Sequence, residues 1–299
     1  MEFVIELALL IGLAWSIDGI LIKKFVNVFG QIKAAFIITT LNFVVSLLML
    51  PFFHSGSINT AGLILALCSG LLSGLGFILF FSSLKSEQAS NTFTLMELQV
   101  VILIIFGILA LSEELSSIVI FGIILILIGV LFVSYTKELK LNRKLIPAML
   151  ANILWGLGWI LFYYSYTYDK SILYTMIASF GASIILPGIY LTYSISRQKN
   201  KASGTIKIKN TDKKIEESRE NKNIIIMIGI IAGLLSGIGN FGFSILESIN
   251  EIAIGSAISN LQPIFITIIA YFVYKERLTK LQTFGIVIAV SGAFIVFLI

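Results

Sequence analysis

The sequence predicts an all-α, polytopic membrane protein with ten transmembrane helices in two inverted five-helix repeats. Three observations support this fold class: the composition, the length of the apolar runs and an internal repeat. Of the 299 residues, 58% are hydrophobic and only 12% are charged, a balance that soluble globular domains do not show. The apolar runs cluster near 20 residues, which is about the length that a helix needs to cross a bilayer.

Ten apolar runs are candidate membrane spans. Transmembrane strands would alternate polar and apolar residues over about ten positions, and these runs do not alternate, so they indicate helices. The predicted spans are 3–22, 34–53, 61–84, 88–111, 117–136, 145–166, 172–195, 223–246, 252–274 and 279–299.

The basic residues predict the orientation. With these spans, 20 of the 21 Lys and Arg residues fall on one side of the membrane, and only Lys170 falls on the other. The positive-inside rule places the basic side in the cytoplasm, which predicts a multi-pass protein of the cell membrane with both termini outside. Residues 196–222 are polar and rich in charge, so we expect a flexible cytoplasmic linker there. A membrane explains the net charge of +5 better than nucleic acid does.

The chain repeats itself. The segment "SGLLSGLGFILF" (69–80) aligns with "AGLLSGIGNFGF" (232–243), and the alignment continues without a gap at an offset of 163. Earlier in each half, "AWSIDGIL" (14–21) aligns with "LWGLGWIL" (154–161) at an offset of 140, and the linker accounts for the difference. The predicted repeats are residues 1–140 and 141–299, the second of them interrupted by the linker.

The number of helices per repeat sets the relation between the halves. Five is odd, so the second copy enters the membrane from the opposite side. Inverted repeats are the architecture of secondary transporters, in which the substrate site lies near the bilayer midplane between the halves.

Glu97 lies within the predicted span 88–111, where a carboxylate facing lipid would cost several kcal/mol. At the offset of 163 it aligns with Asn260, and Gln99 aligns with Gln262. We therefore expect these four residues to line a polar cavity between the halves. Because desolvation disfavours the charged form, Glu97 would bind a proton in competition with substrate. The alternative is a structural carboxylate bonded to a neighbouring helix.

Pro263 and three tryptophans are further candidates. Pro263 removes a backbone hydrogen bond and should kink its helix at mid-depth, which frees a carbonyl group for the cavity or serves the fold alone. Trp155 and Trp159 lie one turn apart and would form an apolar or cation-binding wall. Trp15 is the equivalent of Trp155 in the first half.

Asp18 and Asn240 complete the predicted site. Asp18 lies near Lys23 and Lys24, so it pairs with a nearby charge or acts as a coupling carboxylate. Asn240 must find hydrogen bonds within its span, either across helices or to substrate.

The segment "NLQPIFITIIAYFVYKERLTKLQTFGIVIAVSGAFIVF" (260–297) resembles the end of the repeat of the drug/metabolite transporter superfamily, EamA type. That repeat ends in a Pro-containing helix, a short loop with Glu and a Leu-Thr pair, and a helix with spaced glycines. The matching residues are Pro263, Glu276, Leu278, Thr279, Gly285 and Gly292, with Trp15 and Trp155 in the first helix of each half. The first half departs from the pattern with Val100 in place of the proline.

The resemblance implies two bundles around a central cavity and transport of small organic solutes by alternating access, often export, without ATP hydrolysis. Some relatives keep both termini in the cytoplasm, whereas the charge distribution of this chain places them outside, and the prediction follows the charges.

We therefore expect a secondary transporter that exports an amino acid, amine or similar metabolite, with protons as coupling ions and membrane lipids around a monomer or homodimer. The chain has one histidine, one cysteine, no HExxH and no Gly-rich phosphate loop, so we predict no enzyme, no catalytic residue, no metal and no cofactor. A receptor or scaffold, or an intramembrane enzyme, is the alternative.

Overall fold

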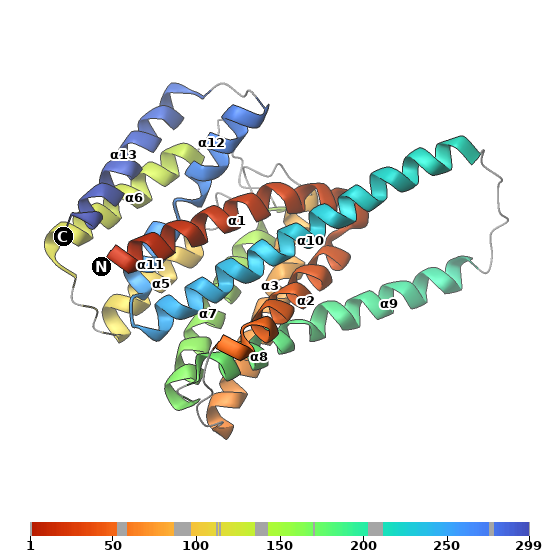
Figure 1. Ribbon diagram of the computed structural model, residues 1–299, viewed down its shortest axis with the longest axis horizontal. Coiled ribbons are helices and arrows are strands. Elements are labelled where there is room, and N and C mark those ends of the chain that lie inside the picture. The colour runs from red at the N-terminus through yellow and green to blue at the C-terminus, as the bar shows by residue number, and fades with distance from the viewer. Residues whose placement is uncertain are drawn as a thin grey trace.

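The computed structural model describes residues 2–52, 59–86, 97–111, 113, 115–134, 143–169, 171–202, 212–274 and 278–298. These residues form a bundle of helices (Figure 1). The helices are α1 (Glu2–Phe29), α2 (Gln31–Leu48), α3 (Thr60–Ser86), α5 (Glu97–Ala110), α6 (Ser117–Ser134), α7 (Ile146–Asp169), α8 (Ile172–Ser183), α9 (Ile185–Ala202), α10 (Asp212–Ser248), α11 (Ile252–Ser259), α12 (Gln262–Tyr274) and α13 (Lys280–Phe297), with a 3₁₀ turn at Leu50–Phe52.

The predicted all-α membrane fold is confirmed. Eight helical segments of the described chain are long and apolar enough to cross a bilayer, and two shorter apolar helices, Leu98–Ala110 and Ser117–Val133, occupy the fourth and fifth predicted spans. Two predicted spans are each divided between two helices: α8 and α9 share one, and α11 and α12 share the other.

The two halves repeat the same contacts. A Cβ atom added to Gly76 of α3 would lie 2.5 Å from Trp155 Nε1 of α7, and one added to Gly239 of α10 would lie 2.5 Å from Trp15 Nε1 of α1. Gly239 is Gly76 shifted by 163, and Trp155 is Trp15 shifted by 140. The repeat in the sequence is therefore also a repeat in packing: α3 lies on α7 as α10 lies on α1.

The α6–α13 contact shows how the halves are related. A Cβ on Gly129 would lie 2.5 Å from the Gly285 carbonyl oxygen, and a Cβ on Gly292 would lie 2.6 Å from the Gly122 oxygen. Residue numbers rise along one helix as they fall along the other, so these equivalent helices are antiparallel. An antiparallel pair of equivalent helices is what inverted repeats produce, and the glycines allow their backbones to touch.

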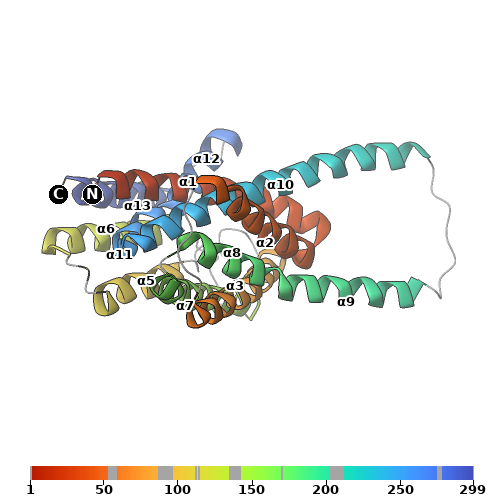
Figure 2. The same cartoon turned by 60° about the horizontal axis from the view of Figure 1, so that its bottom comes forward.

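The expectation of a flexible linker was wrong at both ends of 196–222. Helix α9 continues to Ala202 and α10 begins at Asp212, so two helices project beyond the bundle (Figures 1 and 2). Lys, Glu and Arg are good helix formers, and extending an existing membrane helix needs no new nucleation. Residues 203–211 lie outside the described part of the chain.

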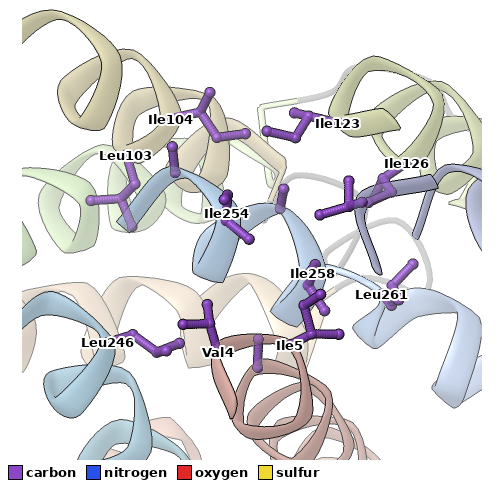
Figure 3. Packing of buried hydrophobic residues seen from close by; sticks show 14 of the residues in the cluster. Val4, Ile5, Leu103, Ile104, Ile123, Ile126, Leu246, Ile254, Ile258 and Leu261 are labelled. Atoms are coloured by element: carbon purple, nitrogen blue, oxygen red, sulfur yellow. The ribbon is translucent and has the colours of Figure 1, made fainter. Parts of the chain in front are cut away.

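The bundle has two distinct ends. Both termini lie at one end, which we call the terminal end, and the α9–α10 extension lies at the other, the basic end (Figure 2). At the basic end the Lys23 ammonium group donates to the Leu84 carbonyl, and the Ser83 hydroxyl donates to the Lys144 carbonyl at 3.0 Å. The largest apolar core lies toward the terminal end, where Val4, Leu246 and Ile258 are among its members (Figure 3).

The α6–α13 contact can be tested with Gly129→Ala. The added methyl group would meet backbone atoms at 2.5 Å, so we expect a loss of about 1–3 kcal/mol of stability and a lower melting temperature in detergent. Gly188→Ala is the matched control, because its Cβ would meet Phe36 at an ordinary 3.6 Å. Equal melting temperatures for the two variants would contradict the close contact.

The predicted orientation can be tested by labelling single cysteines with a membrane-impermeant thiol reagent. In a Cys68→Ala background, we expect Glu2→Cys, at the terminal end, to react in intact cells. Lys222→Cys, on the extension at the basic end, should react only after lysis, because the positive-inside rule places that end in the cytoplasm. Both side chains are exposed. The reverse pattern would show that the termini lie inside.

Candidate functional site

A cavity lies in the middle of the bundle and takes its walls from both halves. It holds about 780 Å³ of space, part of it open to solvent. The lining residues are Trp15, Asp18, Gly19, Ile22, Asn42, Ser73, Phe77, Phe80, Phe81, Gln99, Trp155, Trp159, Phe180, Ser183, Ser236, Asn240 and Gln262. They come from α1, α2, α3, α5, α7, α8, α10 and α12.

Seven of the ten predicted site residues line this one cavity. They are Trp15, Asp18, Gln99, Trp155, Trp159, Asn240 and Gln262. Asn260 and Pro263 are buried beside the cavity and are not part of its lining. Glu97 is the first residue of α5, and its side chain lies outside the described part of the structure.

Pro263 does not kink a continuous helix. The helix breaks into α11 and α12, with a turn at Asn260 and Leu261, and Pro263 is the second residue of α12. A proline fits there because the first helical N–H groups need no helical partner. The carbonyl deprived of its donor is that of Ser259, and it lies against α1, 2.7 Å from where a Cβ on Gly12 would stand. Neither residue lines the cavity, so of the two roles considered for Pro263 this geometry favours the one that serves the fold.

Hydrogen bonds connect the break between α11 and α12 to α1. The Gln262 amide donates to the Trp15 carbonyl at 3.1 Å, and the Ser16 hydroxyl contacts the Gln262 carbonyl at 3.1 Å. Ser16 is fully buried and also bonds to the Gly12 carbonyl. These contacts tie the start of α12 to α1 and hold Gln262 at the cavity wall.

Aromatic rings form a rigid wall of the cavity. The Trp155 indole N–H donates to the Ser73 carbonyl at 3.2 Å, and its ring centroid lies 5.0 Å from that of Phe77 and 5.1 Å from that of Phe80. Trp159 packs edge-on against Phe243 at 4.9 Å. Such a wall binds apolar groups, and its ring faces attract cations.

The acidic group of the cavity belongs to one half only. The Asp18 carboxyl group accepts a hydrogen bond from the Ser236 hydroxyl, and its Oδ1 atom has no partner among the described residues. The repeat places Gly158 at the equivalent position, where a Cβ would lie 3.2 Å from Ser73 Oγ. Ser73 is in turn the equivalent of Ser236. Among the described lining residues, this pair of equivalent positions therefore carries a carboxylate in one half and a glycine in the other.

Asn42 gives the cavity an unsatisfied amide. It is 1% exposed, and neither its Oδ1 nor its Nδ2 atom has a partner among the described residues. Leaving buried polar atoms unpaired costs about 1–3 kcal/mol each. The donor and the acceptor of this amide are therefore available to a polar group bound in the cavity.

Sequence reasoning did not place Ser73 or Ser236 at the site. Ser73 and Ser236 could have been found, because they are equivalents in the repeat and lie one turn from Phe77 and Asn240, which are also equivalent. Among the described lining residues there is one carboxylate and no Lys, Arg or His. The cavity is thus suited to a solute with a positive charge and an apolar part.

Comparison with known proteins agrees with this geometry. The sequence profile of the EamA-like transporter family matches residues 3–135 and 143–298. Among 29 similar solved chains is a crystal structure described only as that of a protein, with a TM-score of 0.70 and 13% identity. The alignment covers 100% of this chain and 97% of that one, which shows a shared fold. A search of curated proteins finds no match.

The two matched segments together cover almost the whole chain, one in each half, and membership of this family implies transport of a small solute across a membrane. The chain belongs to the EamA-like transporter family.

Proposed function

We propose that the chain is a secondary transporter for small organic solutes that combine a protonated amino group with an apolar or aromatic part, namely amino acids or amphipathic amines. The observation that carries this proposal is the lining of the central cavity: a lone carboxylate, an unpaired amide and an aromatic wall.

The amino group would bind at Asp18. Hydrogen bonds to charged groups contribute about 1.5–3 kcal/mol, and Oδ1 is available for one. The Asn42 amide offers both a donor and an acceptor, so it suits either end of a zwitterion. The apolar part would lie against Trp155, Trp159 and Phe77, where burial of apolar surface favours binding.

The repeat supports alternating access as the mechanism. The helices around the cavity form equivalent pairs, so the packing of α3 on α7 has a counterpart in α10 on α1. In an inverted-repeat transporter the halves exchange conformations, and the site opens to one side and then to the other. We propose export as the direction, with protons competing for a cavity carboxylate. Asp18 and Glu97 are the candidates for that role.

A thermal-shift assay with phenylethylamine and phenylalanine tests the binding site. A ligand that binds only the folded protein raises its melting temperature, so we expect a shift for the wild-type chain. Asp18→Asn removes the charge pair and should weaken binding by about tenfold to a hundredfold. Glu6→Gln is the matched control, since Glu6 is exposed on the same helix. Equal shifts for all three proteins would remove Asp18 from the site.

Solute exchange separates transport from the alternatives. In proteoliposomes loaded with unlabelled solute, we expect labelled solute to enter faster than into empty ones, because a carrier returns loaded. A receptor, scaffold or intramembrane enzyme would show no such stimulation. Glu97→Gln tests the second carboxylate: the sequence predicts that exchange is lost or loses its pH dependence. Unchanged exchange with unchanged pH dependence would exclude Glu97 from the mechanism.

A further inference from the structure

Glu247 is a buried acid outside the central cavity. It lies on α10, is 1% exposed, and neither carboxyl oxygen has a hydrogen-bond partner among the described residues. An ionised carboxylate without partners costs several kcal/mol in such surroundings, so the neutral form is the one that this packing accepts. A neutral acid with unpaired oxygens still costs stability.

The repeat shows that the fold does not require an acid here. At the offset of 163, Glu247 is equivalent to Leu84, which is fully buried in α3. The surroundings match: Trp155 packs on Phe80, one turn before Leu84, and Trp15 packs on Phe243, one turn before Glu247. One half thus fills the position with a leucine, and the other keeps a carboxyl group that lowers the stability of the fold.

Glu247 lies between the cavity and the terminal end. Trp159, which lines the cavity, touches Phe243, and one turn further along each helix come Tyr163 and Glu247. The Tyr163 hydroxyl donates to Asn250 Oδ1 at 2.9 Å, and this bond links α7 to the turn after α10. Separating α7 from α10 at this end would break that bond.

Several titratable groups lie around the contact between Tyr163 and Asn250. Tyr163 and Tyr164 belong to α7, and Glu251 follows α10. Helix α1 brings apolar residues of the shared core, among them Val4 and Ala8. From the first half, Glu113 accepts hydrogen bonds from the Ile252 and Ala253 amides at 2.9 and 3.0 Å. Burial raises the pKa of Glu113 to about 7, although the two backbone bonds oppose this. Glu113 must therefore be controlled for in any pH experiment.

We propose that Glu247 is a proton-binding site that couples proton movement to opening of the terminal end. When this end closes, the carboxylate takes a proton from hydronium and is buried as the neutral acid. When α7 and α10 separate, water reaches the group and it returns the proton. This inference rests on the proposed transport function for its role, and on the packing of Glu247 for its chemistry.

The first test measures opening without any solute. The reporter is Ser244→Cys in a Cys68→Ala background, because Ser244 is fully buried three residues before Glu247. Its labelling rate by a water-soluble thiol reagent is compared with the rate in the same protein carrying Glu247→Leu. The ratio of the two rates cancels the ionisation of the thiol. We expect the rate of the protein with Glu247, divided by the rate of the Glu247→Leu variant, to rise about tenfold or more from about pH 5 to about pH 9. The reason is that ionisation of Glu247 favours the open form.

The controls keep this test decisive. Glu247→Gln, a mimic of the neutral acid, should behave like Glu247→Leu and serves if the leucine variant does not fold. Glu113→Gln should keep the rise with pH, since the effect is assigned to Glu247. A ratio that does not change with pH, or a rise that disappears in Glu113→Gln, would overturn the proposal.

The second test measures coupling in proteoliposomes with phenylalanine and phenylethylamine. We expect Glu247→Gln to exchange solute but to lose accumulation driven by an imposed pH gradient. Accumulation equal to that of the wild type would overturn the coupling role. If the wild type exchanges neither solute, it is the proposed function that fails, and the labelling ratio still decides whether Glu247 binds a proton that opens the terminal end.

Discussion

The architecture depends on close antiparallel contact between equivalent helices. Gly122 and Gly129 of α6 meet Gly292 and Gly285 of α13 backbone to backbone. In a membrane, helices gain little from apolar association, so packing of small residues fixes their relation. Once this pair is antiparallel, the other equivalent helices are related in the same way. That relation brings Trp15 and Trp155 to one cavity and puts Gln99 with Gln262 on its walls.

In our proposals, the functional chemistry lies where the halves differ. The position of Asp18 is occupied by a glycine in the other half, and the position of Glu247 is occupied there by a buried leucine. Packing explains the residues that the halves share, because both must fill the same space. A buried carboxyl group costs stability, and the equivalent position in the other half shows that the fold does not need it. A role in binding gives a reason to keep it. The two acids also lie at different depths: Asp18 lines the cavity, and Glu247 lies between it and the terminal end.

The sequence predicted the fold well because the length and hydropathy of each span are local signals, and because the repeat is visible when the two halves are aligned. It predicted much of the cavity lining because mid-helix polar residues on equivalent helices must face inward. It left two roles for Pro263 open, and backbone geometry distinguishes them: Pro263 starts a new helix, so the freed carbonyl of Ser259 faces Gly12. It also missed Glu247, because the predicted span 223–246 ended one residue before it; alignment with Leu84 would have marked it. Helix propensity in 212–222 was overlooked because charge was interpreted as disorder.

The central claim is that one cavity between inverted halves holds a cationic, partly apolar solute. The most direct measurement is an anomalous-scattering map of crystals soaked with bromine-substituted phenylethylamine. We expect the bromine peak against Trp155, Trp159 and Phe77, at a distance that puts the amino group beside Asp18. A fully occupied ligand on the lipid-facing surface, with the cavity filled by protein side chains, would contradict the claim.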